Sequence, residues 1–143
     1  MTAPPTSAVV PHTGVARMVR DVISADARSI VATATIDPAH PLVVAGEAPA
    51  YLGIEIGAQA AAAHAAIGAA AGASTPAVSG RLVRVREASF ARPTLPAGAV
   101  LDVTAACTGA FPPLASYVIT VGLVDAVIVT ATISTYTLEQ ASA

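Results

Sequence analysis

Two side chains in this sequence are suited to moving protons between carbon and oxygen. His40 lies in a short stretch bounded by prolines, and Glu55 follows fifteen residues later in an alanine-rich run. An imidazole can remove the proton next to a thioester carbonyl while a carboxylic acid protonates the departing hydroxyl, which is a β-elimination of water. His40 is therefore the candidate base and Glu55 the candidate acid. The simpler alternatives are a loop histidine without a chemical task, and an acid paired with Arg84 or Arg86.

The run around Glu55 predicts one long helix. Residues 50–72 are dominated by alanine and contain no interior proline, which favours a helix of roughly twenty residues and about 30 Å. Burial among apolar neighbours is expected to keep Glu55 protonated near neutral pH. At 100° per residue, one helix face carries an acid, an amide and small or apolar side chains, namely Leu52, Glu55, Gln59, Ala62, Ala63 and Ala66.

Two further features of the helix bear on chemistry. Backbone N–H groups of its first turn, around Ala50 and Tyr51, could hold a thioester oxygen as negative charge develops on it. His64 lies nine residues after Glu55 and points to the opposite side of the helix. We expect His64 to be a core histidine whose ring nitrogens are bonded.

The rest of the chain alternates apolar and polar residues, as strands do. Two strands, one helix and four more strands predict an α+β fold in which a strongly bent antiparallel sheet wraps around one long helix. A single domain is expected over residues 11–143, after a mobile tail at residues 1–10. The expected strands cover residues 16–23, 29–36, 80–91, 100–108, 115–123 and 126–137.

Composition narrows the possible partners. A net charge of -2 gives no general attraction to nucleic acid or to an anionic membrane. Polar residues inside the helix argue against a membrane span, and the N-terminus does not resemble a signal peptide.

The single Cys107 excludes an intramolecular disulfide and suits a cytoplasmic protein. The three histidines and the acids show no metal-ligand spacing, so no metal is expected. Sparse charge suggests that another subunit covers part of the surface.

A resemblance rests on two segments. Val10-Pro11-His12 lies near the start, and residues 49–60 read Pro-Ala-Tyr-Leu-Gly-Ile-Glu-Ile-Gly-Ala-Gln-Ala. Together they resemble the hotdog-fold 3-hydroxyacyl-(acyl carrier protein) dehydratases, which place a proline six residues before the helix glutamate and a glutamine four residues after it. The similarity is closer to the small dehydratase-like branch of aryl polyene and related polyketide-type pathways, and it follows the order of elements along the whole chain.

The resemblance implies the hotdog fold and dehydration of a 3-hydroxyacyl thioester to the trans-2-enoyl thioester. It implies no soluble cofactor, because the substrate is carried on the phosphopantetheine of an acyl carrier protein. It also implies a dimer of identical or related subunits, with His40 of one subunit facing Glu55 of the other. Gln59 would be the supporting amide, and Ala50 stands where the family has a glycine that donates its N–H.

Two points leave alternatives open. The family's Gly-His-Phe-Pro-Gly loop is replaced by Ala39-His40-Pro41-Leu42, so His12 and His64 stay as reserve candidates. The resemblance is also compatible with thioester hydrolysis or isomerisation, or with a silent partner subunit.

Four arginines form the nearest thing to a basic patch. Arg84, Arg86 and Arg92 share strand parity and are expected on one face, with Arg81 close by. They would suit docking of an acidic carrier protein. The alternative is an ordinary solvated face paired with acids such as Glu87.

Overall fold

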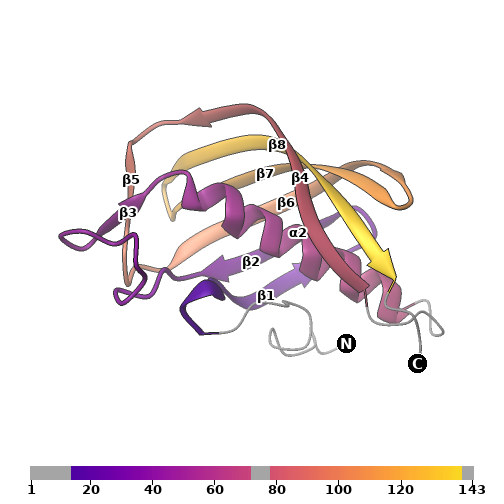
Figure 1. The fold of residues 1–143 in the computed structure, drawn as a ribbon, viewed down its shortest axis with the longest axis horizontal. Helices are drawn as coiled ribbons and strands as arrows, with labels where there is room; N and C mark the ends of the chain where they lie inside the picture. The colour runs from indigo at the N-terminus through magenta and orange to yellow at the C-terminus, as the bar shows by residue number, and fades with distance from the viewer. Residues whose placement is uncertain (1–13, 72–77, 140–143) are drawn as a thin grey trace.

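A curved antiparallel sheet wraps around one helix, as the sequence predicts (Figure 1). The computed structural model describes residues 14–71 and 78–139, and side chains within 14–68 and 81–136. The expected tail at residues 1–10, His12 and the loop at residues 74–76 lie outside the described residues. The elements are η1 (Gly14–Ala16), β1 (Val19–Ala25), β2 (Ser29–Ala34), β3 (Glu47–Pro49), α2 (Leu52–Ala71), β4 (Val78–Phe90), β5 (Thr94–Pro96), β6 (Leu101–Phe111), β7 (Leu114–Leu123) and β8 (Ala126–Glu139).

The main sheet has six strands in the order β1-β2-β6-β7-β8-β4, and each neighbouring pair is antiparallel. Figure 1 shows α2 lying along the concave side of this sheet, while β4 bends past the helix at the sheet's edge. The buried side chains between helix and sheet are mostly aliphatic, and they include Ile30, Ile56, Leu101, Ile119 and Ile133. Among the described residues, no helix combines the length and apolarity needed to cross a bilayer.

Glycines let α2 pack closely against β7 and β8. A Cβ added at Gly53 would lie 2.7 Å from a methyl of Val129, and one added at Gly57 would lie 2.7 Å from the Cδ1 of Ile119. Contacts that short do not occur between packed carbon atoms, so these two positions require glycine at the observed separation. Because Gly53 and Gly57 are one turn apart, they fix which helix face meets the sheet.

A small second sheet was not predicted. β3 pairs with β5 over three residues, and both strands end in a proline. Short strands with proline give almost no alternating signal, so the sequence does not predict this ladder. The ladder joins the segment before α2 to the segment after β4. It therefore fixes where the start of the helix lies relative to the end of β4.

The edge strand β4 is exposed on both faces. Leu82, Val85 and Phe90 pair with buried positions of β8 and therefore lie on the concave face, yet they are 40%, 43% and 43% exposed. The body of α2 does not cover them. We call these three residues the apolar edge of β4. An uncovered apolar edge strand is a surface at which another chain can extend the sheet.

Candidate functional site

Glu55 lies on the helix face that points away from the sheet. It is two residues from both Gly53 and Gly57, a rotation of about 200° from the face that meets β7 and β8. Ala58 and Ala62 share this outer face, and both are half-buried like Glu55 itself. We expected Glu55 to be enclosed among apolar neighbours. Leu52, Ile54 and Ile56 are indeed buried, but Glu55 is only half-buried, because it lies on the face of α2 opposite the sheet.

Gln59, one turn after Glu55, holds the start of β1 onto the helix. It is 1% exposed, and its Oε1 accepts the N–H groups of Met18 at 2.9 Å and Val19 at 3.1 Å. Its Nε2 donates to the carbonyl oxygen of Ala16 at 2.6 Å. The amide is thus bonded to the backbone on both sides. Gln59 therefore holds α2 against the entry to β1.

The start of α2 offers backbone donors, and of the two expected positions Tyr51 is open while Ala50 is not. The N–H of Ala50 donates to the carbonyl oxygen of Pro93 at 2.9 Å, so it is not available to a thioester oxygen. The N–H groups of Gly53 and Ile54 donate to the carbonyl oxygens of Ala50 and Tyr51. Within the described part of the chain, the N–H groups of Tyr51 and Leu52 have no such acceptor. These two are the open donors of the first helical turn.

His40 lies in the loop between β2 and β3 and is anchored by two consecutive turns. Its N–H donates to the carbonyl oxygen of Asp37 at 2.9 Å, and its own carbonyl accepts the N–H of Val43 at 3.0 Å. Its ring nitrogen Nδ1 accepts the N–H of Leu42 at 3.1 Å. The ring is half-buried, and no hydrogen bond or ion pair among the described residues joins it to Glu55.

His64 is a core histidine, as its position on the helix predicts. Its Nε2 lies 2.9 Å from the carbonyl oxygen of Asp26, which can only accept, so Nε2 carries the proton. Nδ1 then accepts the hydroxyl of Tyr117 at 2.8 Å. Burial raises the pKa of Tyr117 to about 12, and the neighbouring Cys107 contributes to the rise. Both ring nitrogens of His64 are used within the fold, on the side of α2 that faces the sheet.

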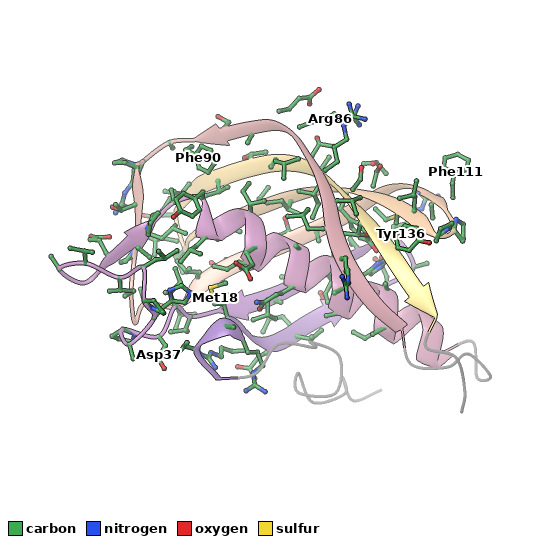
Figure 2. All side chains as sticks on the ribbon, viewed as in Figure 1. Met18, Asp37, Arg86, Phe90, Phe111 and Tyr136 are labelled. Atoms are coloured by element: carbon green, nitrogen blue, oxygen red, sulfur yellow. The ribbon has the colours of Figure 1, made fainter. Side chains whose placement is uncertain are left out.

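The arginines lie on the convex face of the sheet, away from the helix. Arg81, Arg84 and Arg86 pair with Tyr136, Ser134 and Thr132 of β8, which alternate with the buried positions of that strand. We call Arg81, Arg84 and Arg86 the outer arginine row. Figure 2 shows Arg86 extending away from α2. The sheet therefore separates Arg84 and Arg86 from the helix, which removes the alternative in which either one pairs with Glu55.

The composition of this row differs from the expectation in one member. The register shift between Leu82 and Arg84 brings Arg81 back into phase with the other two arginines. Arg92, expected on the same face, lies beyond the end of β4 at Phe90. The prediction from strand parity was wrong for Arg92 because it assumed a regular strand.

One acidic residue near the loop was missed. Glu47 begins β3, and its Oε2 is buried without a hydrogen-bond partner. A buried carboxyl oxygen without a donor is uncommon in folded proteins. No spacing in the sequence marks Glu47, because its burial comes from the β3–β5 ladder that the sequence did not reveal.

A model of the ApeP dehydratases, described as "ApeP-like: ApeP dehydratase", matches residues 4–143 of the chain. The chain belongs to the ApeP-like dehydratase family. No curated protein gives a significant match.

Solved structures similar to the ApeP-like chain support the hotdog fold. The dehydratase heterocomplex ApeI:P from Xenorhabdus doucetiae matches with a TM-score of 0.86 and 20% identity, covering 97% of this chain and 94% of that one. The smu.793 protein of Streptococcus mutans, bound to acetyl CoA, matches with a TM-score of 0.64 and 12% identity over 93% and 98% of the two chains. A hypothetical thioesterase of Streptococcus pneumoniae with coenzyme A has a TM-score of 0.61, 12% identity and coverage of 85% and 88%.

Two cavities of the ApeP-like chain lie away from Glu55 and His40. One of about 330 Å³ borders Arg86, Phe111 and Ser134, and another of about 260 Å³ borders His64, Cys107 and Tyr117. Both flank the tip of the β6–β7 hairpin, where Phe111 projects from the fold (Figure 2). Within the described residues, no three His, Cys, Asp or Glu side chains gather as metal ligands would.

Proposed function

We propose that this chain is a subunit of a dehydratase that converts a 3-hydroxyacyl thioester, carried on acyl carrier protein, to the trans-2-enoyl thioester. The observation that carries the proposal is the position of Glu55. It lies on the outer face of α2, half-buried, three to four residues from the open N–H groups of Tyr51 and Leu52. A carboxyl group beside backbone donors is what proton transfer next to a thioester carbonyl requires.

The reaction needs two proton transfers, one from C2 and one to the hydroxyl oxygen on C3. The C2–H bond breaks, the C2=C3 double bond forms, and the C3–O bond breaks so that the hydroxyl leaves as water with the proton it receives. Glu55 is the proposed proton-transfer group. Donors at the start of α2 would hold the carbonyl oxygen while negative charge develops on it. His40 is the second group of the proposed site, reaching it from the loop of a neighbouring subunit.

We propose that a related hotdog subunit docks at the apolar edge of β4. Leu82, Val85 and Phe90 present apolar area beside unpaired backbone groups of an edge strand. A second sheet aligned there would continue the first and bring a neighbouring helix towards the outer face of α2. The ApeI:P structure, described as a dehydratase heterocomplex, supports a partner that differs from this chain.

The outer arginine row is the proposed contact for the carrier protein. Three exposed guanidinium groups aligned on one face suit an acidic partner, because association steered by opposite charge is fast and weakens with salt. Arg92 lies outside the row and contributes only if the partner reaches past the end of β4. A cytoplasmic location fits a carrier-bound substrate and stays a prediction.

Product analysis tests this function directly. The chain, co-expressed with its related subunit, is incubated with a 3-hydroxyacyl carrier protein, and the carrier-bound acyl group is analysed by intact mass and by chemical release. The proposal predicts loss of one water with the thioester intact. Release of a free acid would instead support thioester hydrolysis. This alternative is considered because the chain is also similar in structure to a hypothetical thioesterase.

A silent role for this chain is the second candidate. The observation in its favour is the hydrogen bond that the N–H of Leu42 donates to Nδ1 of His40, because a neutral imidazole has one basic lone pair and this bond occupies it. In that case the partner subunit would supply the whole reaction. A complex in which Glu55→Gln leaves the rate of water loss unchanged would support the silent role.

A further inference from the structure

The hydrogen bond from Leu42 determines which nitrogen of His40 carries a proton. A backbone N–H can only donate, so Nδ1 must offer it a lone pair. In a neutral imidazole one nitrogen carries the hydrogen and the other accepts. The hydrogen of His40 is therefore on Nε2. A histidine that works as a base through Nε2 needs the opposite arrangement, with Nδ1–H held by an acceptor.

The hydrogen bond from Leu42 to His40 is part of the loop structure, because several other hydrogen bonds hold the same segment in place. The N–H of His40 is bonded to Asp37, the carbonyl of His40 to Val43, and the carboxylate of Asp37 accepts the N–H of Ala39 at 2.8 Å. The contact to Leu42 spans two residues, as in the Asx-turns that aspartate and asparagine form. Rotating the ring to free Nδ1 would break the turn that holds residue 42.

We infer that His40 is a hydrogen-bond donor through Nε2–H and not the base of the reaction. The inference rests on the proposed function, because the acceptor of the Nε2–H hydrogen bond would be an oxygen of the 3-hydroxyacyl thioester. With His40 as donor, Glu55 performs both proton transfers. Its carboxylate takes the proton from C2 and returns it to the hydroxyl on C3 as the C3–O bond breaks, so that water leaves and the carboxylate is regenerated.

The tautomer can be measured without reference to activity. Histidine is labelled with ¹⁵N in the full chain, within the complex, and long-range ¹H–¹⁵N correlations distinguish the protonated ring nitrogen from the unprotonated one. The signals of His40 are identified by their loss in His40→Gln. We expect the hydrogen on Nε2. A hydrogen on Nδ1 would overturn the inference, whether or not the complex is a dehydratase.

Two substitutions separate a donor from a base. Gln places an N–H group close to the position of Nε2, whereas Asn keeps an acceptor for the N–H of Leu42 but has no donor at that distance. A donor role predicts that His40→Gln stays within about tenfold of the unmodified complex, while His40→Asn falls by about 10²-fold, as for loss of one oxyanion donor.

Equal losses in the two variants would indicate a base and contradict the inference. Unchanged rates in both would remove His40 from the site. If the unmodified complex gives no enoyl product, the proposed function fails, and the NMR result still decides the tautomer.

Discussion

Replacing Gln59 by leucine should detach the start of β1 from the helix. The substitution keeps the approximate size of the side chain and removes its polar atoms. It leaves the N–H groups of Met18 and Val19 and the carbonyl of Ala16 without their buried partners. Each buried polar group left without a partner costs about 1–3 kcal/mol.

The cost for each of the three groups should lie near the low end of that range. β1 is an edge strand of the sheet and can move outward to admit water, so we take about 1 kcal/mol for each of the three groups, or about 3 kcal/mol together. That is a large part of the 5–15 kcal/mol that stabilises a typical domain. With an m-value of about 2 kcal/mol/M, the urea midpoint should fall by roughly 1.5 M.

Urea unfolding of the full chain, followed by circular dichroism, measures the loss. Ala62→Leu is the matched control, because Ala62 is half-buried on the outer face of α2 and makes no side-chain hydrogen bond. Hydrogen exchange should rise at the amides of Met18 and Val19 in Gln59→Leu. A midpoint within about 0.3 M of the parent's, which is about 0.6 kcal/mol, would refute the view that Gln59 stabilises the fold by holding the start of β1 to α2. Contact with the substrate would then be the remaining explanation for Gln59.

Three further predictions concern packing, pH and assembly. Gly57→Ala should destabilise the chain by about 1–3 kcal/mol through overpacking. The control Gly68→Ala meets nothing within 4 Å and should be neutral or stabilising, as thermal unfolding will show. The raised pKa of Tyr117 means that the folded chain holds its proton more tightly than the unfolded chain does, so this contribution to stability is complete below pH 10 and is lost as the pH rises to about 12. In a variant with Tyr51 and Tyr136 replaced by phenylalanine, the remaining phenol absorbance should change near pH 12, and a midpoint at pH 10 would contradict this. Val85→Arg on β4 should weaken assembly with the related subunit at least tenfold by ultracentrifugation, whereas Ile23→Arg on the opposite edge, 62% exposed, should not; equal effects would place the interface elsewhere.

The helix and the main sheet could be predicted because each has a strong local signal. A long alanine run without proline favours a helix, and regular alternation favours strands. The outward position of Glu55 depends on Gly53 and Gly57 meeting β7 and β8, a contact between distant segments. Periodicity places residues on faces of a helix, but it does not say which face meets the sheet.

The chemistry of individual groups was harder to predict. The N–H of Ala50 is bonded to Pro93 through a ladder of short proline-ended strands that leave no pattern in the sequence. The tautomer of His40 depends on a local turn to Leu42, which residue types alone do not reveal. Strand parity failed for Arg92 because a β-bulge and the end of β4 interrupt the alternation.

The rate of water loss after Glu55→Gln tests the central claim most directly. The variant chain is assembled with its unmodified related subunit, and conversion of the 3-hydroxyacyl carrier thioester is followed by mass spectrometry, with Asp102→Asn on the convex face as the control. The account predicts a fall of at least about 10²-fold for Glu55→Gln and a normal rate for the control. A normal rate for Glu55→Gln in the assembled complex would contradict it.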